Sequence, residues 1–439
     1  MVRTIWQYFP ELFEDLAKLE DPRKRRYYSM AELLMGCIAL FLFKQGSRNA
    51  LNNQRCEANF RRNYQRLSGV SLPHMDTVDA LLRQLSPDVL EELKASLIAA
   101  LIEQKVLQHT KLAGKYYTLA IDATGAHSYL TNDAAQTRLH KTSKTGKTSY
   151  LHYVMEARLV SASGFSLSVA TEWVANDADR NYQKQDCESR AFEMIAVKLK
   201  RHFPRLHVCL LADGLYANQN FMQTCTGNGW QYIVVLKDDS LKQLQTDITD
   251  THSKDYQSIE LSHLTNKGTW NTQQCISWIN TPFAHKNNPC YWLKCTEATS
   301  VKTEKGWVQK TLKNFVWLTN ILPHQKNIVA LEQVGRMRWK IENEGFNTLK
   351  NQGYALQHRY CRQYFTATQN YYQCMQIAHL INQLIEHSLQ VQTELKTHKK
   401  IAIKYLWLTL MQCMSMLELP DDFVVTNTKI KYQISLSKR

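Results

Sequence analysis

Two short apolar segments, each ending in an aspartate, limit most strongly what this chain can fold into. They are YYTLAID at residues 116–122 and HVCLLAD at residues 207–213. Runs of this length and character are typical of buried strands. Aspartate is common where a strand stops and a turn begins, so either residue alone has a simple structural explanation. In an α/β sheet, however, ligands bind outside the carboxyl ends of the strands, and Asp122 and Asp213 would meet there if the strands are neighbours.

The pattern of the remaining chain surrounds these segments with further strands and helices. Strand-like residues fill 150–161 and 165–172, and a helical pattern covers 186–202. This alternation indicates an α/β fold with parallel strands. We predict a helical N-terminal lobe (1–113), a first part of the α/β core (114–236), a β-rich insertion (237–322), a second part of the core (323–390) and a C-terminal helix with a basic tail (391–439).

An excess of positive charge favours a polyanionic partner. Lys and Arg total 54 against 39 Asp and Glu, which gives a net charge of +15. An ordinary basic enzyme has the same balance, because net charge says nothing about fold. The segment 136–150 is basic throughout, with Arg138, Lys141, Lys144 and Lys147 and no acid. It is expected either to lie along DNA phosphates or to form a solvated surface hairpin.

Cysteine spacing and hydropathy indicate the compartment. The eleven cysteines include no CxxC pair, so reduced thiols in a cytoplasm are expected. The longest apolar run, residues 33–43, falls well short of the roughly 18–20 residues needed to cross a bilayer. The first residues become acidic where a secretory signal would stay apolar. We therefore expect no membrane role and no export.

A third acid is predicted in the helical segment RMRWKIENEGFNTLK. Arg338 and Glu342 are four residues apart and share one helical face, where an arginine beside a metal-binding carboxylate can also hold a DNA phosphate. An ordinary surface ion pair has the same spacing. Glu344 is a competitor, about 200° further round an ideal helix.

Three carboxylates of this kind suit a divalent cation. Two carboxylates a few Å apart repel each other, and shared cations relieve the repulsion. Mg²⁺ prefers oxygen ligands and keeps phosphate oxygens in its shell, whereas a zinc site would call for a His or Cys cluster. Paired metals can activate a water or a 3′-hydroxyl and stabilise the leaving oxygen of a phosphodiester. In-line phosphoryl transfer is the chemistry that this set predicts.

These residues resemble the insertion-sequence DDE transposases of the Y-R-E-K subclass. In that signature Tyr, Arg, Glu and Lys follow one another with two, three and six intervening residues. Arg338 and Glu342 match its middle, Gly335 stands at the Tyr position, and Lys350 comes one residue late. On an ideal helix the extra residue rotates Lys350 about 80° from Glu342. The segments AIDATG, LLADGLYAN and KQDCESRAF also resemble the family, so the similarity spans about 116–360.

The resemblance implies an RNase H-like core with a mixed sheet, a β-rich insertion and a helical front region. It implies that Asp122, Asp213 and Glu342 are catalytic and hold two Mg²⁺ ions, for which Mn²⁺ can substitute. Arg338 and Lys350 would then contact DNA near the scissile phosphate. It further implies a synaptic homodimer that cuts at terminal inverted repeats and joins 3′-hydroxyl ends to target DNA. The expected location is a bacterial cytoplasm, on the nucleoid when DNA is bound.

The insertion is rich in tryptophan, and the resemblance implies that one of these rings stacks on a DNA base. Core packing is the simpler explanation for each of them. The candidates are Trp270, Trp278, Trp292, Trp307 and Trp317.

Two other functions fit the same sequence. One is a non-catalytic DNA-binding protein derived from a transposase, and the other is an RNase H-like nuclease that cuts without strand transfer. Inverted repeats flanking the reading frame would favour a mobile element over both.

Overall fold

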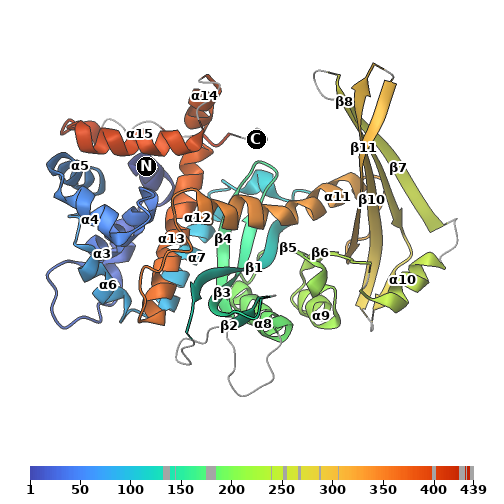
Figure 1. The fold of residues 1–439 in the computed structure, drawn as a ribbon, viewed down its shortest axis with the longest axis horizontal. Coiled ribbons are helices and arrows are strands. Elements are labelled where there is room, and N and C mark those ends of the chain that lie inside the picture. Colours follow the sequence, from blue (N-terminus) through green and yellow to red (C-terminus); the bar gives the residue numbers. More distant parts are fainter. Residues whose placement is uncertain are drawn as a thin grey trace.

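The computed structural model describes residues 1–131, 139–143, 145–174, 184–238, 240–250, 255–264, 268–285, 288–304, 306–397, 402–424, 431 and 433–435. Figure 1 shows three parts side by side: a helical part that holds both the first and the last helices, a central sheet, and a long β-arm at the opposite end. No helix in these ranges combines the length and the apolar character that a bilayer crossing requires.

The helical part is built from both ends of the chain around one buried helix. Helix α3 begins with a capping box, in which Ser29 and Glu32 satisfy each other's free backbone N–H groups, and almost all of its residues are buried. It packs against α13, which comes more than 300 residues later. The helices are α1 (Val2–Tyr8), α2 (Leu12–Lys18), α3 (Met30–Leu42), α4 (Arg48–Cys56), α5 (Ala58–Ser68), α6 (Met75–Leu82), α7 (Pro87–Glu103), α13 (Phe365–Glu386), α14 (Leu389–Thr397) and α15 (Ile403–Met416).

The central sheet has the mixed order β4-β3-β1-β5-β6. Strand β3 runs antiparallel to β1, whereas β5 and β6 follow β1 in parallel. Its strands and helices are β1 (Tyr117–Tyr129), β2 (Leu139–Thr142), β3 (Thr148–Val160), β4 (Ser166–Val174), α8 (Lys184–His202), β5 (Val208–Ala212), α9 (Gln219–Gly227) and β6 (Gln231–Val235). This is the α/β fold with an RNase H-like core that was expected from the sequence.

The β-arm continues the same sheet. Strand β11 pairs with β6 through Trp317 to Thr319, and the order then runs β11-β10-β8-β7. The arm stands away from the central sheet in Figure 1, with α10 beside it. Its elements are α10 (Lys242–Thr249), β7 (Tyr256–Leu264), β8 (Trp270–Ile279), β9 (Phe283–His285), β10 (Asn288–Thr303) and β11 (Gly306–Thr319).

Strand β1 is longer than its sequence pattern suggested. Asp122 does not end the strand, because residues 123–129 continue to pair with β3, with a bulge between Gly125 and His127. The apolar run stops at Asp122 although the strand continues. From Asp122 onward, buried residues are interspersed with partly buried or exposed ones, so polar residues are tolerated. Strand β5 does end just before Asp213, whose side chain caps the 3₁₀ turn Gly214–Tyr216.

The segment that carries Glu342 is not a uniform α-helix. It consists of α11 (Ile328–Arg336), a 3₁₀ turn (Met337–Trp339), a π-helical turn (Ile341–Phe346) and α12 (Asn347–Asn351). Two glycines let this segment approach the sheet. A Cβ on Gly335 would lie 2.8 Å from the Trp317 ring, and one on Gly345 would lie 2.8 Å from Nε of the buried Arg158.

We predict that Gly335→Ala destabilises the protein by about 1–3 kcal/mol, because the added methyl group would overlap the rigid, buried indole of Trp317. The free energy of unfolding in urea measures this effect. Gly227→Ala is the matched control, since it adds the same methyl group at the end of α9 with no atom within 4 Å. Equal stabilities of the two variants would contradict the packing account.

Candidate active site

The register of β1 and β5 brings the two aspartates together. Ala120 pairs with Leu211 in this parallel ladder, and two further residues along each strand place Asp122 beside Asp213. Neighbouring strands lie about 4.8 Å apart, and residues level in a parallel pair point to the same face. The side chains of Asp122 and Asp213 are 32% and 34% exposed. Solvent and a ligand can therefore reach both carboxylates.

The carboxylate of Asp122 is influenced by one positively charged and two negatively charged side chains. Its Oδ2 lies 3.4 Å from Nη1 of Arg338, and its Oδ1 accepts a hydrogen bond of 2.8 Å from the Ala123 N–H. Burial raises the pKa of Asp122 to about 6. Repulsion from Asp213 and Glu342 adds to this rise, while Arg338 and the Ala123 N–H oppose it. The charges of Asp213 and Glu342 therefore both act on Asp122.

Asp213 is fixed by the turn that follows it. Its Oδ1 accepts a hydrogen bond of 2.9 Å from the Leu215 N–H, and its Oδ2 lies 3.9 Å from Nζ of Lys237. The stem of Lys237 passes so close to Gly214 that a Cβ there would lie 2.6 Å from its Cγ. Lys237 was not predicted from the sequence. The available signal was its position two residues after β6, the third of the parallel strands.

Glu342 comes from the π-helical turn, and Lys350 comes from α12, which follows it directly. Lys350 donates a hydrogen bond of 2.7 Å to Oγ1 of Thr124 on β1. Desolvation lowers the pKa of Lys350, and attraction to Glu342 and Asp122 opposes this change. The rotation of about 80° was calculated for an ideal α-helix, whereas residues 341–346 form a π turn. A π turn holds about one more residue than an α turn, so the calculated rotation does not apply to this segment.

Glu344, the competitor for the third position, has another partner. Its Oε1 lies 3.6 Å from Nζ of Lys340, one helical turn earlier. Glu342 is exposed and is the residue whose charge acts on Asp122. This difference favours Glu342 as the third acid.

A cavity of about 580 Å³ opens beside Asp213. Its lining includes the basic side chains of Lys237, Arg336 and Arg338, the ring of Trp339, and the acids Asp213 and Asp238. Trp339 is 51% exposed, and the Arg338 guanidinium lies 4.6 Å from its ring centre. Trp339 was also missed, although it directly follows the predicted Arg338. An exposed ring beside basic side chains suits stacking on a nucleobase.

The three acids fit a divalent cation by their chemistry. Their donors are all carboxylate oxygens, which Mg²⁺ and Mn²⁺ accept. The raised pKa of Asp122 reflects a charged form that lacks compensation, which a cation would supply. Within the described ranges, however, no three His, Cys, Asp or Glu side chains are already close enough to hold one ion. The carboxylates would have to draw together around it.

The basic segment after β1 is partly described. Residues 139–142 and 148–150 form a hairpin, with Lys147 exposed in its turn. The backbone of Lys141 pairs with Ser149. The side chain of Lys141, and the whole of Arg138 and Lys144, lie outside the described residues. A contact of this hairpin with DNA stays a prediction.

The structure separates the five tryptophans of the arm by exposure. Trp278, Trp292 and Trp317 are buried, whereas Trp270 and Trp307 are 43% and 46% exposed. These two pair with the adjacent residues Val301 and Lys302 of β10, so they lie together at the far end of the arm. Core packing thus accounts for three of the five.

Comparison with known proteins supplies a family. The model of the family described as "Transposase DDE domain" matches residues 113–381, more than half of the chain. No curated protein sequence matches the chain. Among solved structures, the cryo-EM structure of the piggyBac transposase synaptic complex with hairpin DNA is similar, with 9% identity and a TM-score of 0.42. That match covers 98% of this chain and 84% of the other.

We predict that Asp122→Asn stabilises the metal-free protein in a pH-dependent manner. Because burial raises the pKa of Asp122 to about 6, ionising it costs more in the folded than in the unfolded chain. The cost is absent below about pH 4 and complete above about pH 6. The variant should therefore melt at a higher temperature than the wild type at about pH 7.5, and the difference should vanish at about pH 4.

Asp250→Asn is the control, since it makes the same substitution at an exposed position at the end of α10. Thermal unfolding in the presence of a chelator measures both variants. A gain for Asp122→Asn that is the same at both pH values would show that burial of the charge is not its cause.

Proposed function

This chain belongs to the transposase DDE domain family, and on that premise we propose that it cuts DNA at the terminal inverted repeats of a mobile element and joins the 3′-hydroxyl ends to target DNA. The observation that carries the proposal is the level placement of Asp122 and Asp213 on neighbouring parallel strands, with Glu342 acting on Asp122 from the π-helical segment.

In this proposal the cations around the acids hold the DNA. Arg338 is oriented by Asp122, lies over the Trp339 ring and lines the cavity beside Asp213, where its guanidinium would meet a phosphate. Lys350 is held by Thr124 and lies on the Glu342 side, whereas Lys237 lies on the Asp213 side. A phosphodiester between them would meet positive charge from both sides. Trp339 offers a stacking surface for the adjacent base.

Asp122, Asp213 and Glu342 would hold the metal, which we propose to be two Mg²⁺ ions, with Mn²⁺ as a substitute. When bound, the ions supply a Lewis acid that activates the attacking oxygen and stabilises the leaving oxygen. The protein groups place the phosphate, and the partial burial of Asp122 limits the access of water. The attacking oxygen can come from water or from a 3′-hydroxyl, which is why one site can serve cleavage and joining. A homodimer would bring two DNA ends together.

We predict that Glu342→Gln abolishes both cleavage and joining, while Glu344→Gln retains them. Removing a metal ligand should cost several kcal/mol of transition-state stabilisation, which is a roughly 10²-fold or greater loss of rate. The assay uses labelled DNA from the ends of the element, intact or pre-cut with a free 3′-hydroxyl, and a target plasmid. Glu344→Gln is the matched control, because it removes the same charge two residues away, from a side chain paired with Lys340.

The outcomes of this assay separate the other functions. Cleavage without joining of pre-cut ends by the wild type would indicate a nuclease. DNA binding without either step would indicate a non-catalytic DNA-binding protein. Loss of activity in Glu344→Gln but not in Glu342→Gln would reverse the assignment of the third acid.

We also predict that the choice of metal separates binding from chemistry. Mg²⁺ and Mn²⁺ should support cleavage and joining, whereas Ca²⁺, with longer bonds and looser geometry, should permit DNA binding with little chemistry. The same labelled DNA measures both, by gel shift and by product formation. Full activity in a chelator would rule out the metal-dependent account.

A further inference from the structure

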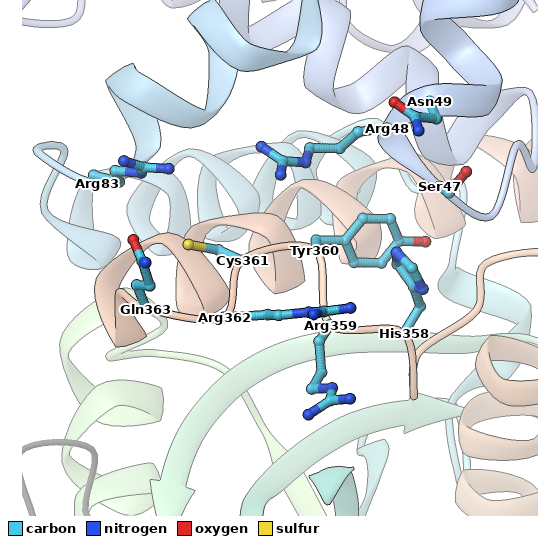
Figure 2. Close-up of a pocket in the computed structure, with 10 residues that line it drawn as sticks. All are labelled: Ser47, Arg48, Asn49, Arg83, His358, Arg359, Tyr360, Cys361, Arg362 and Gln363. Carbon is cyan, nitrogen blue, oxygen red and sulfur yellow. The ribbon is translucent and has the colours of Figure 1, made fainter. Parts of the chain in front are cut away.

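A second basic cavity lies apart from the acids, where the helical part meets the segment that follows α12. Its volume is about 580 Å³. Figure 2 shows its two walls, with Ser47, Arg48, Asn49 and Arg83 from the helices on one side and the segment 358–363 on the other. The lining residues are Ser47, Arg48, Asn49, Arg83, His358, Arg359, Tyr360, Cys361, Arg362 and Gln363. Four are arginines, and none is an acid.

The helical wall holds its two arginines through one carboxylate. Asp79 is buried, with 1% of its side chain exposed, and it forms ion pairs with both Arg48, at 3.2 Å, and Arg83. A second acid, Asp76, lies 3.6 Å from Arg48 but is 75% exposed, so water screens it. The Arg83 guanidinium also lies 4.7 Å from the ring centre of Tyr364. These contacts orient both guanidinium groups without fully neutralising them.

The opposite wall carries positive charge with less compensation. Arg359 and Arg362 are both exposed. In the described part of the chain, neither residue forms an ion pair with a carboxylate, and Arg359 contacts the Tyr129 ring instead, at 5.4 Å from its centre. An exposed arginine without an acidic partner keeps its N–H donors for an anion.

Two further features agree with an anion site. The pKa of His358 is lowered, first by burial and then by Arg362, Arg48 and Arg359, so the positive charge of both walls acts on this ring. Helix α4 also begins at this wall, with Ser47 as its N-cap. The N-terminus of a helix carries partial positive charge that favours phosphate groups.

We propose that this cavity binds phosphates of the DNA backbone, as a DNA contact separate from the acids. The proposal rests on the proposed function for the identity of the polyanion. The cavity is larger than one phosphate group needs. Its basic side chains lie on both walls, where they could contact a DNA strand that passes between them. A free phosphate or nucleotide shares this chemistry, and the experiment below distinguishes these sources.

The cavity is also linked to the strand that carries Asp122. Nε2 of His127 lies 3.0 Å from the carbonyl oxygen of His358, a hydrogen bond when that nitrogen carries the proton. His127 follows Asp122 by five residues on β1, which corresponds to about 16 Å of strand. At about 3.4 Å per base pair, this length of strand corresponds to roughly five base pairs of DNA. The cavity can thus fix the register of the DNA on the acids.

Arg362→Ala tests the proposal. Phosphate contacts carry no sequence information, so a labelled duplex of arbitrary sequence is a sufficient probe, with a chelator present to prevent cleavage. The affinity, measured by fluorescence anisotropy over a series of salt concentrations, should fall about tenfold. The slope of log affinity against log salt should become shallower by about 1 for each phosphate that the variant no longer neutralises. Arg362→Lys should restore most of the slope, because it keeps the charge.

Arg201→Ala is the matched control, since it removes one exposed arginine from α8, outside both cavities. It should leave the affinity and the slope near the wild-type values, and both variants should melt with the wild type. Equal DNA binding by Arg362→Ala and wild type, or no DNA binding by the wild type, would overturn the proposal. So would an equal decrease in affinity for Arg362→Ala and Arg201→Ala.

Inorganic phosphate, added at constant ionic strength, distinguishes the source of the anion. If it raises the melting temperature of the wild type but not of Arg362→Ala, while DNA affinity is the same in both, the cavity holds a small anion and the DNA contact is refuted. If DNA affinity depends on Arg362 but the wild type neither cuts nor joins DNA with Mg²⁺ or Mn²⁺, the phosphate site stands and the proposed function fails.

Discussion

The parallel pairing of β1 with β5 is the constraint on which the geometry of the candidate active site depends. Both strands are buried on both faces up to their aspartates, so their register is set by core packing. A slip of one residue would turn Asp122 to the opposite face from Asp213, and the apolar residues before it would turn with it. The packing of these apolar residues in the core therefore keeps the two acids at the same level. No separate interaction between the two acids is needed for this.

The third acid depends on a different interaction, which involves a buried arginine. Arg158 on β3 is fully buried and bonds Ser166 at 3.0 Å, Gln376 at 2.8 Å and His379 at 2.9 Å. These partners come from β4 and α13, and the π-helical turn rests on the same guanidinium at Gly345. A buried charge is tolerated only when its donors are satisfied, so this network resists rearrangement. It ties the Glu342 segment to both the sheet and the helical part.

Local patterns in the sequence were enough to predict the strands, the two aspartates and the fold class, because strand periodicity and apolar runs report burial directly. They could not predict the π turn. This turn packs at Gly345 against Arg158, a residue almost 190 positions earlier, and a local pattern does not report such a contact. Lys237 and Trp339 were missed for a similar reason. Their relevance depends on which strand ends and turns become neighbours. The domain boundaries and the roles of the individual site residues stay predictions.

The sheet that β6 shares with β11 gives the arm a mechanical property. Trp307 at its far end lies ten residues from Trp317 at its base, about 33 Å along one strand. Interstrand hydrogen bonds resist bending more than a flexible linker would, so the arm acts as a stiff lever whose pivot lies beside β6. A force applied near Trp270 and Trp307 would be transmitted to the strand that precedes Lys237. It would displace the end of that strand, beside the acids, instead of being absorbed by bending of the arm.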